Sequence, residues 1–242
     1  MRRIKIAATS VILPALTFVT MVTPFSAAAQ EATPVTTYSC EAVASASPMA
    51  GMPGMAMSTP AAEGEMAGMS MEFDQMYIDM MIPHHAGIIA LAQAAQDRLT
   101  DERLQAIADN IIASQQAEIE ELRGYREQWY GSPEPMPMDD AMMGMMMEMM
   151  PGMGDRDAMM MQMNPDALVA AFCASEDPDL AFIELSIPHH EMAIMASEAA
   201  LDQATRDEIR AIAERVIADQ QREIDELSAI QQELTGAAEA AA

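Results

Sequence analysis

The sequence predicts an all-α protein, a four-helix bundle built from two copies of one helical hairpin. The first observation is an internal duplication: residues 74–122 align with residues 179–227 at a constant offset of 105 positions, without a gap and with 22 of 49 positions identical. The second is that apolar residues recur at three- and four-residue steps in both copies, as on the buried face of an amphipathic helix. One hairpin cannot cover its own apolar stripe, so the two copies are expected to bury each other.

The chain begins with a segment that predicts export. Basic residues at positions 2, 3 and 5 precede an apolar run, which closes on small residues before Gln30. This order is typical of a secretory signal peptide, here expected to be cleaved after Ala29. A membrane anchor is the weaker interpretation, because proline and threonine interrupt a span already short for a bilayer. We therefore expect an exported protein, periplasmic or extracellular in the cell envelope, with no stable membrane insertion after cleavage.

The mature chain is strongly acidic. The full sequence has 12 Lys and Arg residues against 38 Asp and Glu residues. Loss of the three basic residues of the leader leaves nine, for a formal charge of −29. Such a chain repels nucleic acid and anionic lipid and concentrates cations around itself, although solubility alone would also explain the charge. We expect metal ions rather than nucleic acid as partners.

Each duplicated unit is expected to form two helices joined by a short turn. The turns are placed near residues 97–100 and 202–205, where the apolar periodicity is interrupted. The last residue of each turn, Thr100 or Thr205, is a candidate N-cap for the helix that follows.

Methionine dominates the segments outside the duplicated units. Residues 30–71 hold seven methionines and residues 131–165 hold fourteen, with few aromatic or β-branched residues. We expect both segments to be mobile and disordered, with a short helix at 142–150 as the alternative. Flexible thioethers suit low-specificity capture of Cu(I) or Ag(I), whereas oxidant scavenging and a plain linker are the other interpretations.

The two cysteines, Cys40 and Cys173, have no metal-ligand spacing, and in an exported protein they either form one disulfide or remain free. The expected organisation in chain order is a signal peptide (1–29), a flexible segment (30–71), a first hairpin (72–130), a methionine-rich linker (131–165), a second hairpin (166–236) and a tail (237–242).

All four histidines of the chain lie in two equivalent Pro-His-His sequences, at 83–85 and 188–190. Imidazole suits copper, zinc, nickel and iron, so these histidines are candidate metal ligands. Adjacent positions on a helix diverge by about 100°, so each pair is expected to supply one ligand and one supporting residue. The candidates are His84, His85, His189 and His190.

Methionines near the histidines are candidate co-ligands. Thioether sulfur favours Cu(I), while imidazole accepts both oxidation states of copper. Core filling is the alternative role for these methionines. The candidates are Met80, Met81, Met192 and Met195.

Four polar residues are candidates for supporting the site. Gln115 and Gln220 interrupt the apolar stripes, so each is expected to orient an imidazole across the bundle or to form an interhelical amide bond. Asp79 and Glu184 lie four residues before the prolines, and a proline inside a helix would kink it there and offer oxygens to a cation. Alternatively, each proline starts a new helix.

A resemblance to a known family rests on Met80-Met81-Ile82-Pro83-His84-His85, followed by an apolar helix and Gln115-x-x-Glu118-Ile119. This pattern resembles the exported bacterial family called domain of unknown function 305, which includes periplasmic CopM-type copper-binding proteins. The resemblance covers both units and implies a ferritin-like four-helix bundle with copper ligands among the histidines and methionines. Family members usually carry a methionine seven residues after the first histidine, where this sequence has Leu91 and Ala196, so the two sites are expected to differ.

Together these observations predict an exported copper-binding protein that captures, buffers or delivers Cu(I) or Cu(II) in copper homeostasis or resistance, without enzymatic turnover. A copper-transfer protein is the partner that such a role implies, and the sequence leaves the oligomeric state open. The alternatives are a ferritin-like metal-dependent oxidase and a metal-free helical interaction module. No histidine has a glutamate three residues before it, as in di-iron proteins of this fold, which disfavours the oxidase.

Overall fold

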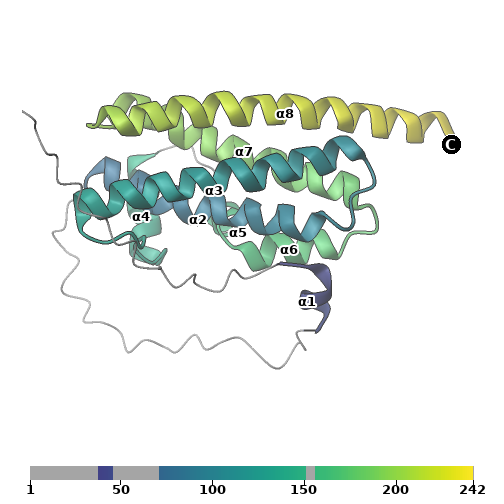
Figure 1. Cartoon of the computed structure of the whole chain (residues 1–242), viewed down its shortest axis with the longest axis horizontal. Helices are drawn as coiled ribbons and strands as arrows, with labels where there is room; N and C mark the ends of the chain where they lie inside the picture. The colour runs from purple at the N-terminus through teal and green to yellow at the C-terminus, as the bar shows by residue number, and fades with distance from the viewer. Residues whose placement is uncertain (1–37, 46–70, 151–155, 242) are drawn as a thin grey trace, which may run out of the picture. The chain divides into compact units, whose positions relative to one another are not determined.

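The computed structural model describes residues 38–45, 71–150 and 156–241, and these residues contain helices and no strand (Figure 1). The expected signal peptide and most of the segment 30–71 lie outside them. No helix among the described residues is long and apolar enough to cross a membrane. The predicted all-α four-helix bundle is confirmed. Its helices are α2 (Phe73–Ala95), α3 (Glu102–Tyr130), α7 (Pro178–Gln203) and α8 (Asp207–Ala241), the last running through most of the expected tail.

The bundle consists of two antiparallel hairpins, α2 with α3 and α7 with α8, packed so that α2 contacts α7 and α3 contacts α8. The start of α7 lies beside the end of α2, where the Thr100 amide donates to Asp179 at 2.8 Å. Arg103 at the start of α3 pairs with Glu233 near the end of α8 at 2.6 Å. Both contacts between hairpins are therefore antiparallel, and α3 and α7 run in the same direction.

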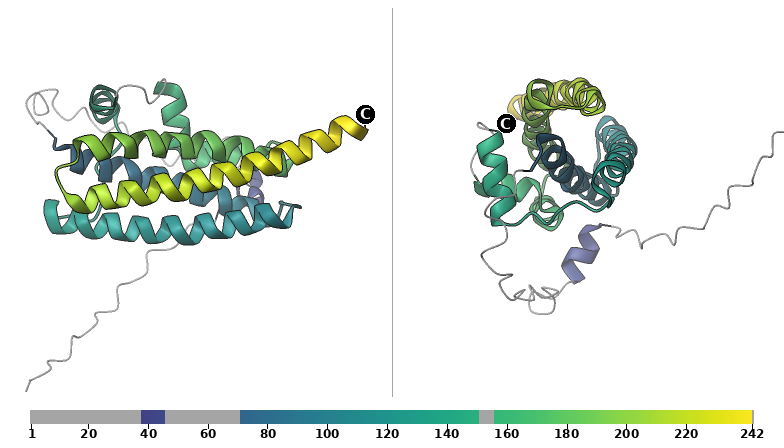
Figure 2. Two further views of the ribbon diagram at one scale, coloured as in Figure 1. Left: turned by 90° about the horizontal axis from the view of Figure 1, so that it is seen from above. Right: turned by 90° about the vertical axis from the view of Figure 1, so that its left-hand side faces the viewer.

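Because α3 and α7 are parallel, their connection has to travel the length of the bundle. Three short helices make up this crossover: α4 (Asp140–Met149), α5 (Arg156–Gln162) and α6 (Pro165–Cys173). Helix α6 packs against α2 and α7, and both views of Figure 2 place the crossover helices on the side of the bundle opposite α3. One long crossover is the connection that distinguishes ferritin-like bundles from simple up-and-down bundles.

The expectation that residues 131–165 are mobile is wrong for α4 and α5, and the short-helix alternative for 142–150 is correct. Asp139 caps α4 by accepting hydrogen bonds from two amides of the first turn. An unbranched thioether fills irregular gaps between helices, and full burial of one such side chain contributes about 1.5–3 kcal/mol. The crossover methionines buried in the core are Met142, Met143, Met146, Met150, Met159 and Met163.

The apolar core falls into two clusters along the bundle. One joins the first half of α2 and the second half of α7 to α4 and α5, and it includes Ile82. The other joins the second half of α2 and the first half of α7 to α6, and it includes Ile88. The two Pro-His-His sequences therefore lie between two apolar clusters.

A reciprocal pair of aspartates fastens each hairpin to the turn of the other. Asp179 accepts hydrogen bonds from the amide and the hydroxyl of Thr100, at 2.8 and 2.5 Å. Its repeat equivalent, Asp74, accepts the same two bonds from Thr205, at 2.9 and 2.5 Å. The threonines are thus not the N-caps that the sequence suggested, and α3 is capped instead by the side chain of Asp101.

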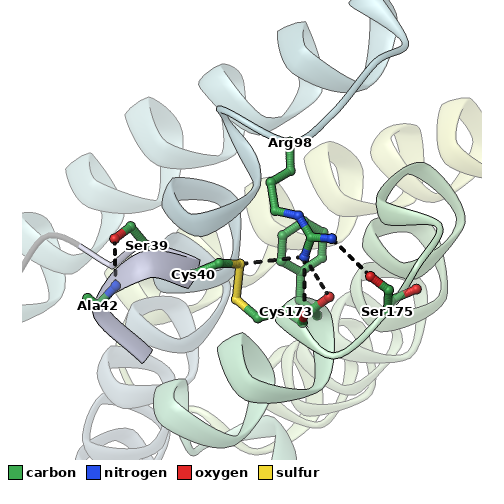
Figure 3. Close-up of a disulfide and its surroundings, with 7 residues drawn as sticks. Ser39, Cys40, Ala42, Arg98, Cys173 and Ser175 are labelled. Atoms are coloured by element: carbon green, nitrogen blue, oxygen red, sulfur yellow. Dashed lines mark hydrogen bonds between the residues drawn. A yellow bond between two sulfur atoms is a disulfide. The ribbon is translucent and has the colours of Figure 1, made fainter. Parts of the chain in front are cut away.

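The short helix α1 (Cys40–Ser45) is held to α6 by a disulfide between Cys40 and Cys173 (Figure 3). Of the two alternatives for the cysteines, the structure contains the disulfide. Arg98 reaches the C-terminal end of α6 beside it, donating to the carbonyl oxygens of Cys173 at 3.3 Å and Ser175 at 2.9 Å. Its guanidinium also lies over the Phe172 ring, 5.3 Å from the centroid. A cation at a helix C-terminus satisfies its free carbonyls and opposes its dipole.

We expect Thr100→Val to lower the free energy of unfolding by about 1–3 kcal/mol, because the buried carboxylate of Asp179 loses one of its two donors. Urea denaturation followed by far-UV circular dichroism measures the change. Thr235→Val on exposed α8 is the matched control and should change stability by less than about 0.5 kcal/mol. Equal stabilities of the two variants would show that the hydrogen bond from Thr100 to Asp179 contributes nothing to the free energy of unfolding.

Candidate metal site

The four histidines meet in the middle of the bundle, and none of their side chains has exposed surface. Helices α2 and α7 carry one pair each at equivalent positions. Because these helices are antiparallel and related by the duplication, each first histidine faces its own equivalent. The ring centroids of His84 and His189 are 3.7 Å apart, with their planes inclined by 35°.

Both prolines lie inside continuous helices, Pro83 in α2 and Pro188 in α7, so the alternative that they start new helices is wrong. The acidic side chains one turn before them have other environments. Asp79 forms a buried ion pair with Arg126, whereas Glu184 is exposed. Neither carboxylate is free in the interior to contact a metal ion.

A glutamate lies beside the second histidine of each pair. His85 Nε2 and Glu118 Oε2 are hydrogen bonded at 2.8 Å. His190 Nε2 and Glu223 Oε2 are also 2.8 Å apart, but they are not aligned for a hydrogen bond. The sequence alone did not predict a role for these glutamates, although both belong to the Gln-x-x-Glu-Ile element that recurs in the two repeats. A carboxylate in this position fixes the ring orientation of a metal-binding histidine and leaves its other nitrogen free.

The remaining ring nitrogens are buried without hydrogen-bond partners. This holds for both nitrogens of His84, both nitrogens of His189, and Nδ1 of His85 and His190. Such groups each cost about 1–3 kcal/mol when left unsatisfied in the interior. An unprotonated imidazole nitrogen in this situation is available to a metal ion.

The two glutamines, Gln115 and Gln220, are also buried, each 2% exposed. Neither amide makes a hydrogen bond in the structure, so neither the bond to an imidazole nor the interhelical amide bond is formed. Their amide groups add further polar atoms without hydrogen-bond partners to the buried faces of α3 and α8.

The candidate methionines divide by burial. Met80 and Met81 are fully buried one turn before the histidines of α2, and Met192 is 4% exposed one turn after those of α7. Met195 is 38% exposed, which places it at the surface rather than with the buried imidazoles.

The crossover approaches α2 at Gly87, the repeat equivalent of Met192. A Cβ atom on Gly87 would lie 2.9 Å from the Gln162 carbonyl oxygen and 3.5 Å from His189 Nε2. Only a glycine lets the crossover backbone come this close to α2. Gly87 therefore contacts the crossover and the His189 ring at one point of α2.

Among the described residues, no group of three or more His, Cys, Asp and Glu side chains is arranged to hold a metal ion. A cation between His84 and His189 would therefore need a methionine sulfur or a small movement of another imidazole. The donor set of neutral imidazole and thioether fits copper, above all Cu(I).

Burial lowers the pKa of His84 well below its ordinary value of 6.5, and the neighbouring His85 and His190 lower it further. Burial likewise lowers the pKa of His189, with His84, His190 and His85 adding to the effect. A positive charge in this apolar layer would be costly. Both facing imidazoles are therefore neutral at physiological pH, which is the form that binds metals.

We expect the metal-free protein to lose roughly 2–3 kcal/mol of stability between pH 7.5 and pH 5.5, because His84 and His189 stay neutral when folded but gain protons when unfolded. Their contribution is fully present above the unfolded pKa near 6.5 and declines as the pH falls below it. Urea denaturation in the presence of a chelator measures the change.

The double variant His84→Leu/His189→Leu removes both groups and should flatten this pH dependence. The comparison stays above pH 5.5, where ordinary carboxylates remain ionised. The same slope in the wild type and the double variant would contradict the assignment.

Solved structures of known proteins share this architecture. CopM in its Cu(I)-bound form is 26% identical with a TM-score of 0.52, over 66% of this chain and 96% of that chain. CopM in its Cu(II)-bound form is 28% identical with a TM-score of 0.51, over 69% of this chain and 99% of that chain. A DUF305 protein from Streptomyces coelicolor, 18% identical with a TM-score of 0.52 over 67% of this chain and 92% of its own, shares the fold.

Among curated proteins, uncharacterized protein L153 of Acanthamoeba polyphaga mimivirus is 41% identical over 49 residues, which is 20% of this chain and 32% of that protein. The match thus spans about a third of the relative's length. The sequence profile of the family described as "Domain of unknown function (DUF305)" matches residues 19–125 and 74–231. Since these two matches together cover most of the chain, the protein belongs to the DUF305 family.

Proposed function

We propose that this protein binds copper outside the cytoplasm, where it captures, buffers or delivers the metal in copper homeostasis or resistance without enzymatic turnover. The observation that carries the proposal is the contact between His84 and His189. Their four ring nitrogens are buried, neutral and without hydrogen-bond partners. A metal ion would satisfy these nitrogens and offset the cost of burying them.

Copper is the metal that the surrounding donors favour. Met80, Met81 and Met192 are buried within one turn of the histidines, and thioether sulfur selects Cu(I) over harder ions. Imidazole accepts both oxidation states. The similarity to CopM, which has been solved with Cu(I), with Cu(II) and with silver, supports the same choice.

We assign roles to the two histidines of each pair from their contacts. His84 and His189 would provide the first nitrogen ligands, because nothing else engages their rings. His85 would be held in orientation by Glu118, with Nδ1 free for the metal or for support of a neighbouring ligand. His190 lies equally close to Glu223 but without a hydrogen bond, so both of its ring nitrogens would be available, and each hairpin would contribute to one shared interior site.

Export is part of the proposal. The leader at residues 1–29 has the order of a signal peptide, and a disulfide between Cys40 and Cys173 suits an oxidising compartment. A copper-transfer protein outside the cytoplasm would then supply or receive the metal.

The test is an equilibrium titration of the metal-free mature chain with Cu(I), Cu(II), Zn(II) and Fe(II). We expect the tightest site to take Cu(I) and to be lost in His84→Ala/His189→Ala, because these residues supply its first ligands. Glu118→Gln should keep the site but weaken it about 10–100-fold, because a group that orients a ligand is lost.

Tyr77→Phe is the matched control, since Tyr77 is fully buried in α2 and its repeat equivalent is Phe182. This variant should bind copper as the wild type does. Unchanged copper affinity in the histidine variant, with its helical spectrum intact, would overturn the proposal.

The exposed methionines of the crossover are proposed as a second, weaker capture surface. Met147, Met160 and Met161 are 38–42% exposed, unlike the crossover methionines that fill the core. Replacing these three with leucine should lower the number of weakly bound Cu(I) or Ag(I) ions and leave the interior site unchanged. Unchanged stoichiometry by competition titration would reduce them to ordinary surface residues.

A further inference from the structure

A groove runs along the surface where α3 meets α8, on the side of the bundle that the crossover does not cover. Its volume is about 500 Å³. A second hollow of about 410 Å³ shares Asn110 and Glu226 with it and continues along the same two helices. The polar residues of the groove are Asn110 and Ser114 on α3 and Asp219, Arg222, Glu223 and Glu226 on α8.

Glu223 connects this groove to the histidines. Its side chain lines the groove, yet the residue is only 7% exposed. The same carboxylate lies 2.8 Å from His190 Nε2 and makes no aligned hydrogen bond. One residue therefore lines the surface groove and also contacts the buried imidazole layer.

The charge of the groove favours cations. Three carboxylates line it against one cation, Arg222, and that guanidinium is bonded to Asp219 at 2.9 Å. Glu223 and Glu226 form no ion pair with Arg222, although its positive charge acts on both, so the carboxylates of the groove still outnumber its cation. An acidic groove in a strongly acidic protein concentrates cations at its mouth.

At the repeat-equivalent position, which also lies between α8 and α3, an ion pair spans the two helices. There Arg215 and Glu121 form an ion pair of 2.5 Å across α8 and α3. The duplication offset makes Asn110 the equivalent of Arg215, and Glu226 the equivalent of Glu121. A neutral asparagine cannot form that ion pair, so the bridge exists at one of the two positions only.

Glu118, the repeat equivalent of Glu223, also contacts a histidine and reaches the surface, with 14% of its side chain exposed. The apolar clusters fill the bundle on both sides of the imidazole layer, and the crossover backbone lies against Gly87 beside His189. The groove is thus a hollow that leads from the surface to a residue in contact with the layer, whereas the Arg215–Glu121 ion pair lies one helical turn from Glu118.

We propose that this groove is the access route by which a monovalent copper or silver cation reaches the buried histidines, with Glu223 receiving the ion and passing it to His190. The inference rests on the proposed copper binding and adds where the ion crosses the protein surface. Asn110 keeps the route open, whereas the Arg215–Glu121 ion pair closes its symmetry-related counterpart.

The test is Asn110→Arg, which recreates across Asn110 and Glu226 the bridge that Arg215 forms with Glu121. The probe is Cu(I) supplied as a chromophoric chelate, with capture followed by stopped-flow absorbance and affinity measured by equilibrium competition. Two controls are Asn110→Gln, which stays neutral, and Ala211→Arg, which adds the same charge at an exposed position of α8 that does not line the groove.

We expect Asn110→Arg to slow capture and release of Cu(I) roughly tenfold while the affinity stays within about twofold, because a closed route hinders both directions. Both controls should remain within about twofold of the wild-type rates. The inference is overturned if Asn110→Arg captures copper at the wild-type rate, or if Ala211→Arg slows capture equally. It is also overturned if affinity falls in step with the capture rate, because the groove would then be part of the binding site. Loss of histidine-dependent binding in the wild type would instead refute the copper proposal itself.

Discussion

The contact between His84 and His189 depends on one constraint, the antiparallel packing of two helices related by duplication. When two equivalent helices pack antiparallel, a residue near the middle of α2 contacts the equivalent residue of α7. A residue at the start of one helix instead lies beside the end of the other. The same relation pairs Asp179 with Thr100 and repeats the bond at the opposite end of the bundle. The reciprocal end contacts fix the alignment of α2 on α7, and that alignment brings the imidazoles together.

The crossover is a second consequence of the same packing. With α3 and α7 parallel, the chain must return along the bundle before the second hairpin begins, and residues in that return path acquire a buried face. Methionine suits this path because its side chain adapts to gaps that the four main helices leave between them. A methionine-rich composition that resembles a low-complexity linker is therefore compatible with core packing. A linker and a core-packed segment can be distinguished only when the positions of the other helices are known.

The sequence was sufficient to predict the bundle and the hairpins, because the periodicity and the duplication each report on local geometry. It left open whether the four histidines form one site or two, because the contact between His84 and His189 depends on how the two hairpins pack. It did not reveal which carboxylates reach the histidines. Glu118 lies 33 positions from His85, and its contact depends on how the two helices of the hairpin are rotated against each other. The solvent-exposed position of Met195 was missed for the same reason, since a few tens of degrees of rotation separate a core position from a surface one.

The interior of the bundle combines polar groups with a scaffold that does not satisfy them. Imidazole and amide atoms lie unpaired between two apolar clusters, in a layer where each such atom opposes folding. The aspartate–threonine contacts between the hairpins and the methionine-filled core lie outside that layer and stabilise the fold without it. The metal-free bundle can therefore persist with its candidate ligands already assembled. Pre-assembled ligands lose little freedom on binding, which raises affinity for the ion. For the proposed role of holding copper and releasing it to a partner, it is an advantage that the stability of the fold does not depend on the metal.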